Sequence, residues 1–206
     1  MTSSTPPGEP TYADRTYRST PATVAGALLL LLIAWLLGDA LISGEGRAPW
    51  LALAGAVLVA PLVVAFTLRP AVLAGARRIL IRNPFRTIVL PWSRMADVRA
   101  AYSTELFTTD GKKYQVWALP VSLRDRKRAV RQSSAARREG AEARKQVRPA
   151  VADQAVADLR KLAEEDAATG GAAGAQEVTA SVRWAWEIIG PAVAGGIALV
   201  VLFATT

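Results

Sequence analysis

Two apolar runs decide the fold of this chain: ATVAGALLLLLIAWLL at residues 22–37 and WLALAGAVLVAPLVVAFTL at residues 50–68. A helix needs about 17–25 mostly apolar residues to cross the ~30 Å hydrocarbon layer of a bilayer. Each run reaches that length when its interfacial flanks are counted, and the polar link SGEGR at residues 43–47 separates them. The pattern predicts a transmembrane hairpin over residues 21–69, with helices at about 22–42 and 49–68.

A third apolar run, residues 188–204, follows Trp184 and Trp186 near the C-terminus. At about 1.5 Å per residue it nearly spans a bilayer, and tryptophans typically lie at the membrane–water interface. We therefore expect a third transmembrane helix within residues 184–206. Small residues let membrane helices approach closely, so we expect this helix to pack on the hairpin. Its glycines are Gly190, Gly195 and Gly196.

The positive charge is concentrated in one segment. Of the 25 Lys and Arg residues, 22 lie within residues 69–183, together with 12 of the 17 acids. Positive residues next to membrane helices stay on the cytoplasmic side. The charge therefore predicts a multi-pass protein of the cell membrane, with the N-terminus and residues 69–183 in the cytoplasm and the C-terminus outside. Arginine and alanine, both encoded by GC-rich codons, dominate the composition, which indicates a high-GC bacterial source.

The composition also excludes several kinds of site. The chain has no Cys and no His, so it lacks thiol nucleophiles, thiolate metal sites, the commonest metal ligand and the usual general base near neutral pH. It contains no Walker-type loop and no dinucleotide-binding fingerprint. We expect a protein that is not an enzyme and holds no cofactor and no metal.

Between the hairpin and the charged region, residues 70–120 show short β-type runs. Candidate strands at 71–74, 78–82, 86–90 and 98–102 are separated by turn residues such as Asn83-Pro84. The clearest hairpin joins residues 105–109 to 112–119 through Asp110-Gly111, a pair that tolerates the positive φ of a tight turn. About six short strands predict a small, bent antiparallel sheet or partial barrel, with residues 93–97 as a helical turn or an irregular connection.

The order of these features resembles the bacterial pleckstrin-homology-like (PH-like) domains: the strand at 78–82, Asn83-Pro84, the strand at 86–90, Pro91-Trp92, then the Asp110-Gly111 hairpin that ends in Tyr114-Gln115-Val116-Trp117. It is similar in particular to the actinobacterial group named for low molecular weight protein antigen 6, in which a membrane hairpin precedes a PH-like module. The resemblance implies a fold of seven strands with a C-terminal capping helix.

The rest of the chain is polar. We expect residues 1–20 to be a disordered tail and residues 121–166 to be a charged helical segment. Residues 121–148 would form a mostly solvated helix, whereas residues 150–166 carry a helical apolar face. A flexible linker, residues 167–183, would follow. The apolar face comprises Ala152, Val156, Leu159 and Ala163.

Three residues are candidate ligand-binding residues. PH domains that bind phosphoinositides carry basic residues around the loop between their first two strands, and the resemblance places Arg77 and Arg78 at the matching positions. Trp117 is the third candidate, because an exposed aromatic ring can contact a peptide or a lipid. The competing interpretation puts Trp117, like Trp92, in the core of the sheet, where each would bury a large apolar area.

These features together predict an α+β membrane protein: an N-terminal transmembrane hairpin, a small antiparallel PH-like β-module, charged helices and a C-terminal transmembrane helix. The favoured function is a non-enzymatic scaffold whose module binds a partner protein or anionic lipid headgroups. One alternative is an accessory subunit of a membrane transporter or enzyme complex. Another is nucleic-acid binding through residues 121–148, which is disfavoured because acids interrupt the arginines and no aromatic residue is available for base stacking.

Overall fold

The computed structural model describes residues 15–75, 77–122, 127–128, 130–131, 151–168 and 179–205. Three helices are long and apolar enough to cross a membrane, with mean hydropathies of 2.3, 2.5 and 2.1. They are α1 (Thr20–Ser43), α2 (Ala48–Val63), which a π-helical turn continues over Val64–Leu68, and α6 (Trp186–Ala204). Antiparallel strands and a further helix, α5 (Val151–Ala168), form the remaining part. The predicted α+β fold class is confirmed.

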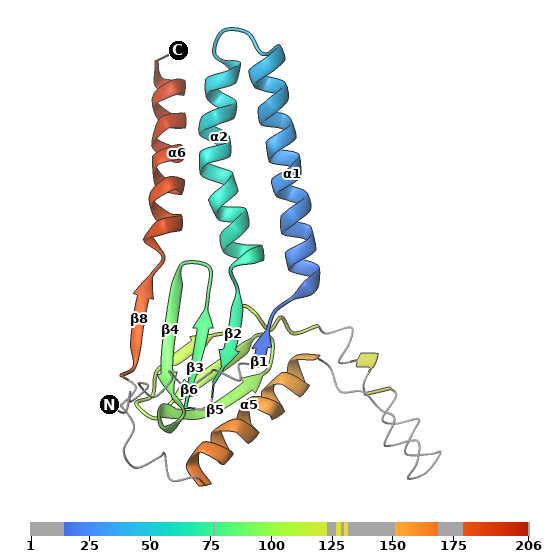
Figure 1. Ribbon diagram of the computed structural model, residues 1–206, viewed down its shortest axis with the longest axis vertical. Helices are drawn as coiled ribbons and strands as arrows, with labels where there is room; N and C mark the ends of the chain where they lie inside the picture. Colours follow the sequence, from blue (N-terminus) through green and yellow to red (C-terminus); the bar gives the residue numbers. More distant parts are fainter. Residues whose placement is uncertain are drawn as a thin grey trace, which may run out of the picture.

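The three long helices form a bundle in which α2 lies between α1 and α6 (Figure 1). Gly195 of α6 faces the backbone of α2: a Cβ there would lie 2.8 Å from the Val57 carbonyl carbon and 2.9 Å from the Ala54 oxygen. The prediction that α6 glycines allow close packing on the hairpin is thus confirmed at Gly195. At Gly190 it is wrong, because that position faces open space. At the far end of the bundle, Arg47 donates hydrogen bonds to the Thr205 and Leu202 carbonyls at the end of α6.

The strands form two sheets below the bundle (Figure 1). All neighbouring strands in both sheets are antiparallel. The first sheet has the order β1-β2-β3-β4-β8, and its strands are β1 (Arg15–Tyr17), β2 (Ala71–Ala74), β3 (Arg78–Arg82), β4 (Arg86–Pro91) and β8 (Ser181–Trp184). The second contains β5 (Met95–Ala100), β6 (Thr104–Thr108) and β7 (Lys113–Gln115). We call these sheets together with α5 the module.

Both edges of the first sheet correct the sequence-based expectations. Residues 15–17 were expected in a disordered tail, yet they form β1, with Arg15 opposite Ala74 of β2. Residues 181–183 were expected in a linker, yet they belong to β8, with Arg183 opposite Thr87 of β4. Segments of three or four residues carry too little pattern to be recognised as strands. They pair because a sheet edge presents unpaired N–H and C=O groups that an adjacent segment can satisfy.

The second sheet also differs locally from the prediction. The helical turn expected at residues 93–97 is only Trp92–Arg94, and β5 already begins at Met95. The last strand, expected at residues 112–119, is limited to Lys113–Gln115. The Asp110-Gly111 turn is confirmed, because Gly111 has a φ of 78°, a conformation that glycine adopts without steric cost.

The module core lies between the two sheets and α5. Alternate side chains of β3, Ile79 and Ile81, point inward and are fully buried, as the period of two in a strand requires. Val156 and Leu159 of α5 complete this core, so the predicted apolar face of residues 150–166 is confirmed and α5 takes the place of a capping helix. The helix predicted over residues 121–148 lies outside the described residues except at a few positions.

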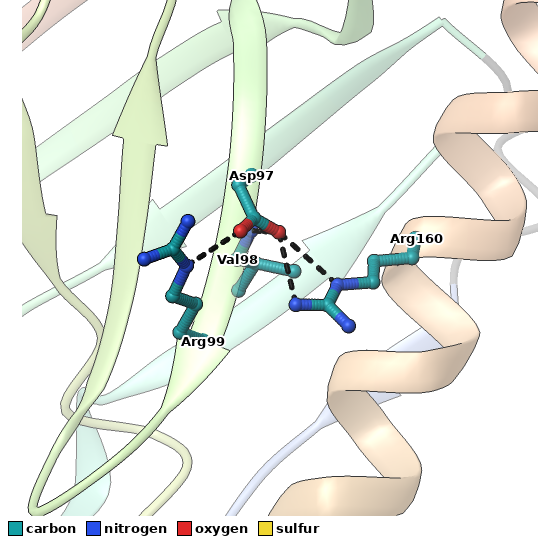
Figure 2. A network of polar contacts seen from close by, with 4 residues as sticks. All are labelled: Asp97, Val98, Arg99 and Arg160. Atoms are coloured by element: carbon teal, nitrogen blue, oxygen red, sulfur yellow. Dashed lines mark hydrogen bonds and ion pairs between the residues drawn. The ribbon is translucent and has the colours of Figure 1, made fainter.

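A polar network ties α5 to β5 (Figure 2). Asp97 Oδ1 accepts hydrogen bonds from the Val98 backbone N–H at 2.7 Å and from Arg160 Nε of α5 at 3.1 Å, and Arg160 Nη2 lies 3.0 Å from the same oxygen. Asp97 Oδ2 accepts from Arg99 Nε at 2.6 Å. These interactions, led by the hydrogen bond from Arg99, lower the pKa of Asp97 below its usual 3.8.

The lowered pKa predicts how stability depends on pH. A carboxyl with a lower pKa in the folded state contributes stability above its unfolded pKa and loses it as the pH falls through the folded value. We expect Asp97→Asn to reduce the free energy of unfolding at pH 7 by about 1 kcal/mol. The difference from wild type should shrink below pH 3.8. Urea unfolding in mild detergent, followed by tryptophan fluorescence, measures this.

A double-mutant cycle with Arg160→Gln provides the control. If the two substitutions lower stability independently at pH 7, the ion pair between β5 and α5 does not stabilise the module. A pH-independent effect of Asp97→Asn would likewise contradict the expectation.

Candidate functional site

Each of the three long helices continues into a strand of the first sheet through a very short link. Two residues separate β1 from α1, two separate Leu68 from β2, and Ala185 alone separates β8 from α6. The sheet is therefore connected directly to the bundle at three points (Figure 1). The turn between β3 and β4 and the C-terminal end of β8 lie at the bundle, whereas the turn between β2 and β3 lies at the opposite end of the module.

Arg69, the first residue after the second span, joins the bundle to the sheet. Its guanidinium donates to Glu187 Oε1 of α6 at 2.7 Å, to Thr87 Oγ1 of β4 at 3.1 Å and to the Asn83 carbonyl at 3.2 Å. The Arg69 side chain is only 17% exposed, but Glu187 is 62% exposed, so solvent screens the ion pair more than the bonds to Thr87 and Asn83. Because all three partners belong to other elements, Arg69 positions the start of α6 and the bundle end of β3 and β4 relative to α2.

A pocket with a volume of about 320 Å³ opens beside Arg69. Three arginines against one glutamate leave two positive charges in it at neutral pH. Leu80 and Trp184 supply apolar wall. We call this cavity the junction pocket. Its lining residues are Arg69, Leu80, Arg82, Thr87, Arg183, Trp184 and Glu187.

The strand register aligns two of these arginines across the sheet. Arg82 of β3 is opposite Thr87 of β4, and Thr87 is opposite Arg183 of β8. Side chains directly opposite one another point to the same face of a sheet. Both arginines are exposed, and no hydrogen bond or ion pair joins either guanidinium to another residue that the structure describes. The junction pocket therefore presents two available guanidinium groups with a hydroxyl between them.

An aromatic cluster of Phe66, Phe85 and Trp117 lies at the same junction. The Phe66 ring makes edge contacts with Phe85, at 5.3 Å between centroids, and with Trp117, at 5.5 Å. Asn83 holds Trp117 in place: its Oδ1 accepts from the Trp117 backbone N–H at 3.2 Å, and its Nδ2 donates to the Gln115 carbonyl at 2.8 Å. Asn83 is only 3% exposed, so this pair of bonds fixes the buried turn between β3 and β4.

The structure separates the predicted site residues. Trp117 lies at the bundle end of the module, but Arg77 and Arg78 lie at the other end, after β2 has run away from α2. The four residues of β2 alone extend about 13 Å at about 3.3 Å per residue. This length exceeds the Debye length of about 8 Å at physiological ionic strength, so the charges of Arg77 and Arg78 are largely screened from the bundle end of the module. Arg77 also has an opposite charge nearby, the Asp166 carboxyl of α5. Burial raises the pKa of Asp166, and the positive charge of Arg77 opposes that rise.

The two tryptophans behave differently. Trp92 is 2% exposed, and its indole N–H donates to the Gly75 carbonyl at 2.9 Å, so the expectation that it fills the core is confirmed. The same expectation is wrong for Trp117, which is 45% exposed. The Trp117 ring contacts Phe66, which follows α2 in the π-helical turn.

Sequence reasoning missed the residues that form the junction pocket. Arg82 and Arg183 are 101 positions apart and meet only through the β4 register. One signal was present: Arg69, Trp184 and Glu187 all lie at the ends of apolar runs, where interfacial residues are expected. Chemically, the arrangement is suited to bind an anion. Among the described residues, no group of three or more Asp and Glu side chains is placed to hold a metal ion.

Comparison with known proteins gives one finding. Residues 69–140 match the family described as bacterial PH domain, and searches of curated proteins and of solved structures return no significant match. The similarity to the low molecular weight protein antigen 6 group is not tested by this match and stays a prediction. The match begins at Arg69, the residue that joins the bundle to the sheet, and includes β2 through β7. Residues 69–140 of this chain are therefore a bacterial PH-like domain.

Proposed function

We propose that this chain is a non-enzymatic integral membrane protein that holds its PH-like module against the cytoplasmic surface of the cell membrane, where the module binds an anionic lipid or a partner protein. One observation carries the proposal: all three membrane-length helices continue into the same sheet through links of one or two residues. Such short links leave little freedom to rotate, so the junction pocket and the aromatic cluster face the bilayer surface.

The charge distribution supports the orientation. The module end of the bundle carries Arg15, Arg18, Arg69 and the arginines of the sheet, whereas Arg47 is the one basic residue at the opposite end among the described residues, beside the acids Asp39 and Glu45. Arg47 is also engaged by carbonyl groups at the end of α6, which is a favourable place for a cation. Positive residues next to membrane helices favour the cytoplasmic side. The module is therefore cytoplasmic, and the C-terminus is outside.

Binding is better supported than catalysis. The chain has no His and no Cys, and the exposed charges of the module are mostly guanidinium groups, which bind anions and do not transfer protons at neutral pH. Two surfaces are available. The junction pocket faces the lipid, and the turn that contains Arg77 and Arg78 faces the cytoplasm, where only a soluble partner or a soluble part of a membrane protein can reach it.

The proposal predicts two results with the full-length chain in cells. Because the chain lacks cysteine, Asp110→Cys and Glu45→Cys each introduce one reactive thiol. An impermeant thiol reagent applied to intact cells should label the Glu45→Cys variant and leave the Asp110→Cys variant unlabelled until the cells are opened. The reverse pattern would show that the module is outside.

The second result concerns binding. Purification from membranes in mild detergent should retain specific lipid or protein, and Arg77→Ala/Arg78→Ala or Trp117→Ala should reduce it. Arg94→Ala/Lys161→Ala is the matched control, because it also removes two positive charges from exposed positions of the module. If wild type, both binding variants and the control all retain the same lipids and proteins, these residues do not form binding surfaces. A stoichiometric transporter or enzyme partner would identify an accessory subunit.

A further inference from the structure

The junction pocket combines features that point to one class of ligand. It carries two positive charges, it contains the exposed and available guanidinium groups of Arg82 and Arg183, and the Thr87 hydroxyl lies between them in the strand register. Adjacent strands are about 4.8 Å apart, so the two arginines are separated by about 10 Å at the backbone. Their long side chains can converge on one tetrahedral anion in the middle, which matches the preference of arginine for phosphate oxygens.

The position of the pocket selects the source of the phosphate. Arg69 directly follows the last residue of the second span, and Glu187 lies in the first turn of α6. Both residues therefore lie at the depth of lipid headgroups. Trp184 is 57% exposed beside the pocket, and Trp186, the first residue of α6, is 69% exposed, as expected for aromatic residues at a membrane–water interface.

We infer that the junction pocket binds the phosphodiester headgroup of an anionic phospholipid, with Arg82 and Arg183 contacting the phosphate, Trp184 contacting the start of the acyl region and Leu80 forming the wall farther from the bundle. The inference rests on the proposed function for the placement of the module at the bilayer. Each nitrogen of the Arg69 guanidinium already donates one hydrogen bond, to Asn83, Glu187 or Thr87, so Arg69 is a positioning residue. The site is at the opposite end of the module from Arg77 and Arg78.

An anionic headgroup suits the pocket better than a zwitterionic one. The pocket keeps two positive charges after Glu187 is paired with Arg69. The quaternary ammonium or amine of a zwitterionic lipid would lie near these charges and be repelled. Each Arg near a membrane surface contributes about 1 kcal/mol of attraction to anionic lipid. Removal of both arginines should therefore lower the preference for anionic lipid about 30-fold.

Native mass spectrometry of the full-length protein tests this directly. The protein is released from mixed micelles that contain equal amounts of phosphatidylglycerol and phosphatidylcholine, and the ratio of the two lipids that stay bound is measured. Wild type should retain phosphatidylglycerol preferentially. Arg82→Gln/Arg183→Gln should lower that preference about 30-fold, and Arg82→Lys/Arg183→Lys should keep part of it. Arg94→Gln/Lys161→Gln should behave like wild type, since α5 and the turn with Arg94 lie at the far end of the module.

The outcomes separate the pocket from the proposed function. If wild type prefers phosphatidylglycerol and the Arg82/Arg183 glutamine variant keeps that preference, the pocket is refuted while lipid binding by the protein stands. If wild type shows no preference, both the pocket and the lipid part of the proposed function fail, and only partner binding is left. Displacement of the lipid by millimolar inorganic phosphate or glycerol 3-phosphate, with equal binding of those soluble anions, would identify a free anion as the ligand and overturn the lipid assignment.

Discussion

Gly195→Ala is expected to loosen the bundle by separating α6 from α2. A Cβ at this position would contact the backbone nitrogen of Leu58 and lie within 2.9 Å of the Val57 carbonyl carbon and the Ala54 oxygen. Backbone atoms of a helix cannot rotate away as a side chain can, so the helices must move apart. Overpacking of this kind costs about 1–3 kcal/mol, and we expect the upper end of that range. Unfolding by sodium dodecyl sulfate in mixed micelles measures it.

Gly190→Ala is the matched control on the same helix. No atom of the described residues lies within 4 Å of the Cβ that this substitution adds, so stability should be unchanged or slightly raised. Equal behaviour of the two variants would mean that α6 does not pack on α2 through Gly195. Ala185 alone separates β8 from α6, so a shift of α6 should also move β8. We therefore expect Gly195→Ala to lower lipid binding at the junction pocket, and lipid retention is a second readout.

Asn83→Ala is expected to destabilise the module by about 2–4 kcal/mol, because it leaves the Trp117 N–H and the Gln115 carbonyl without their side-chain partners. Asn83 is 3% exposed, so water cannot replace both bonds at full strength. The substitution should also free Trp117 from the aromatic cluster. Urea unfolding in mild detergent gives the free energy, and the tryptophan emission maximum should move to longer wavelength.

Gln115→Ala provides the comparison for this prediction. It removes an exposed amide side chain from the same strand but keeps the backbone carbonyl that accepts from Asn83 Nδ2. Its effect should stay within about 0.5 kcal/mol, as for most surface substitutions. An Asn83→Ala variant as stable as Gln115→Ala would show that the turn between β3 and β4 does not depend on this amide.

The membrane helices and the central strands could be predicted because their signals are local. Apolar runs of sufficient length predict spans wherever they occur, and the strands around Ile79, Ile81 and Ile88 carry β-branched residues next to turn residues. The apolar face of α5 was predicted for the same reason, since four small or apolar side chains recur at helical spacing. A family resemblance built on residues 78–117 anticipated the bacterial PH domain.

The candidate site could not be predicted in the same way. Arg77 and Arg78 were selected by analogy, but the direction of β2 places them at the end of the module opposite the bundle. The sequence left Trp117 with two interpretations, an exposed contact residue or a core residue; its position depends on the Asn83 amide and on Phe66, which belongs to the second span. Interactions of this kind join residues that lie tens of positions apart, and no short window of sequence contains them.

The sequence by itself determined that three helices can cross a membrane, that a small β-rich domain lies between the second and third, and that the positive charge is concentrated in residues 69–183 between those two helices. These properties follow from composition and periodicity along the chain. Only the tertiary structure decided that residues 15–17 and 181–184 complete the sheet, and that Arg82 and Arg183 meet across β4 beside Arg69. The reason is physical: strand pairing is specified by register and by unsatisfied sheet edges, which exist only once the chain has folded.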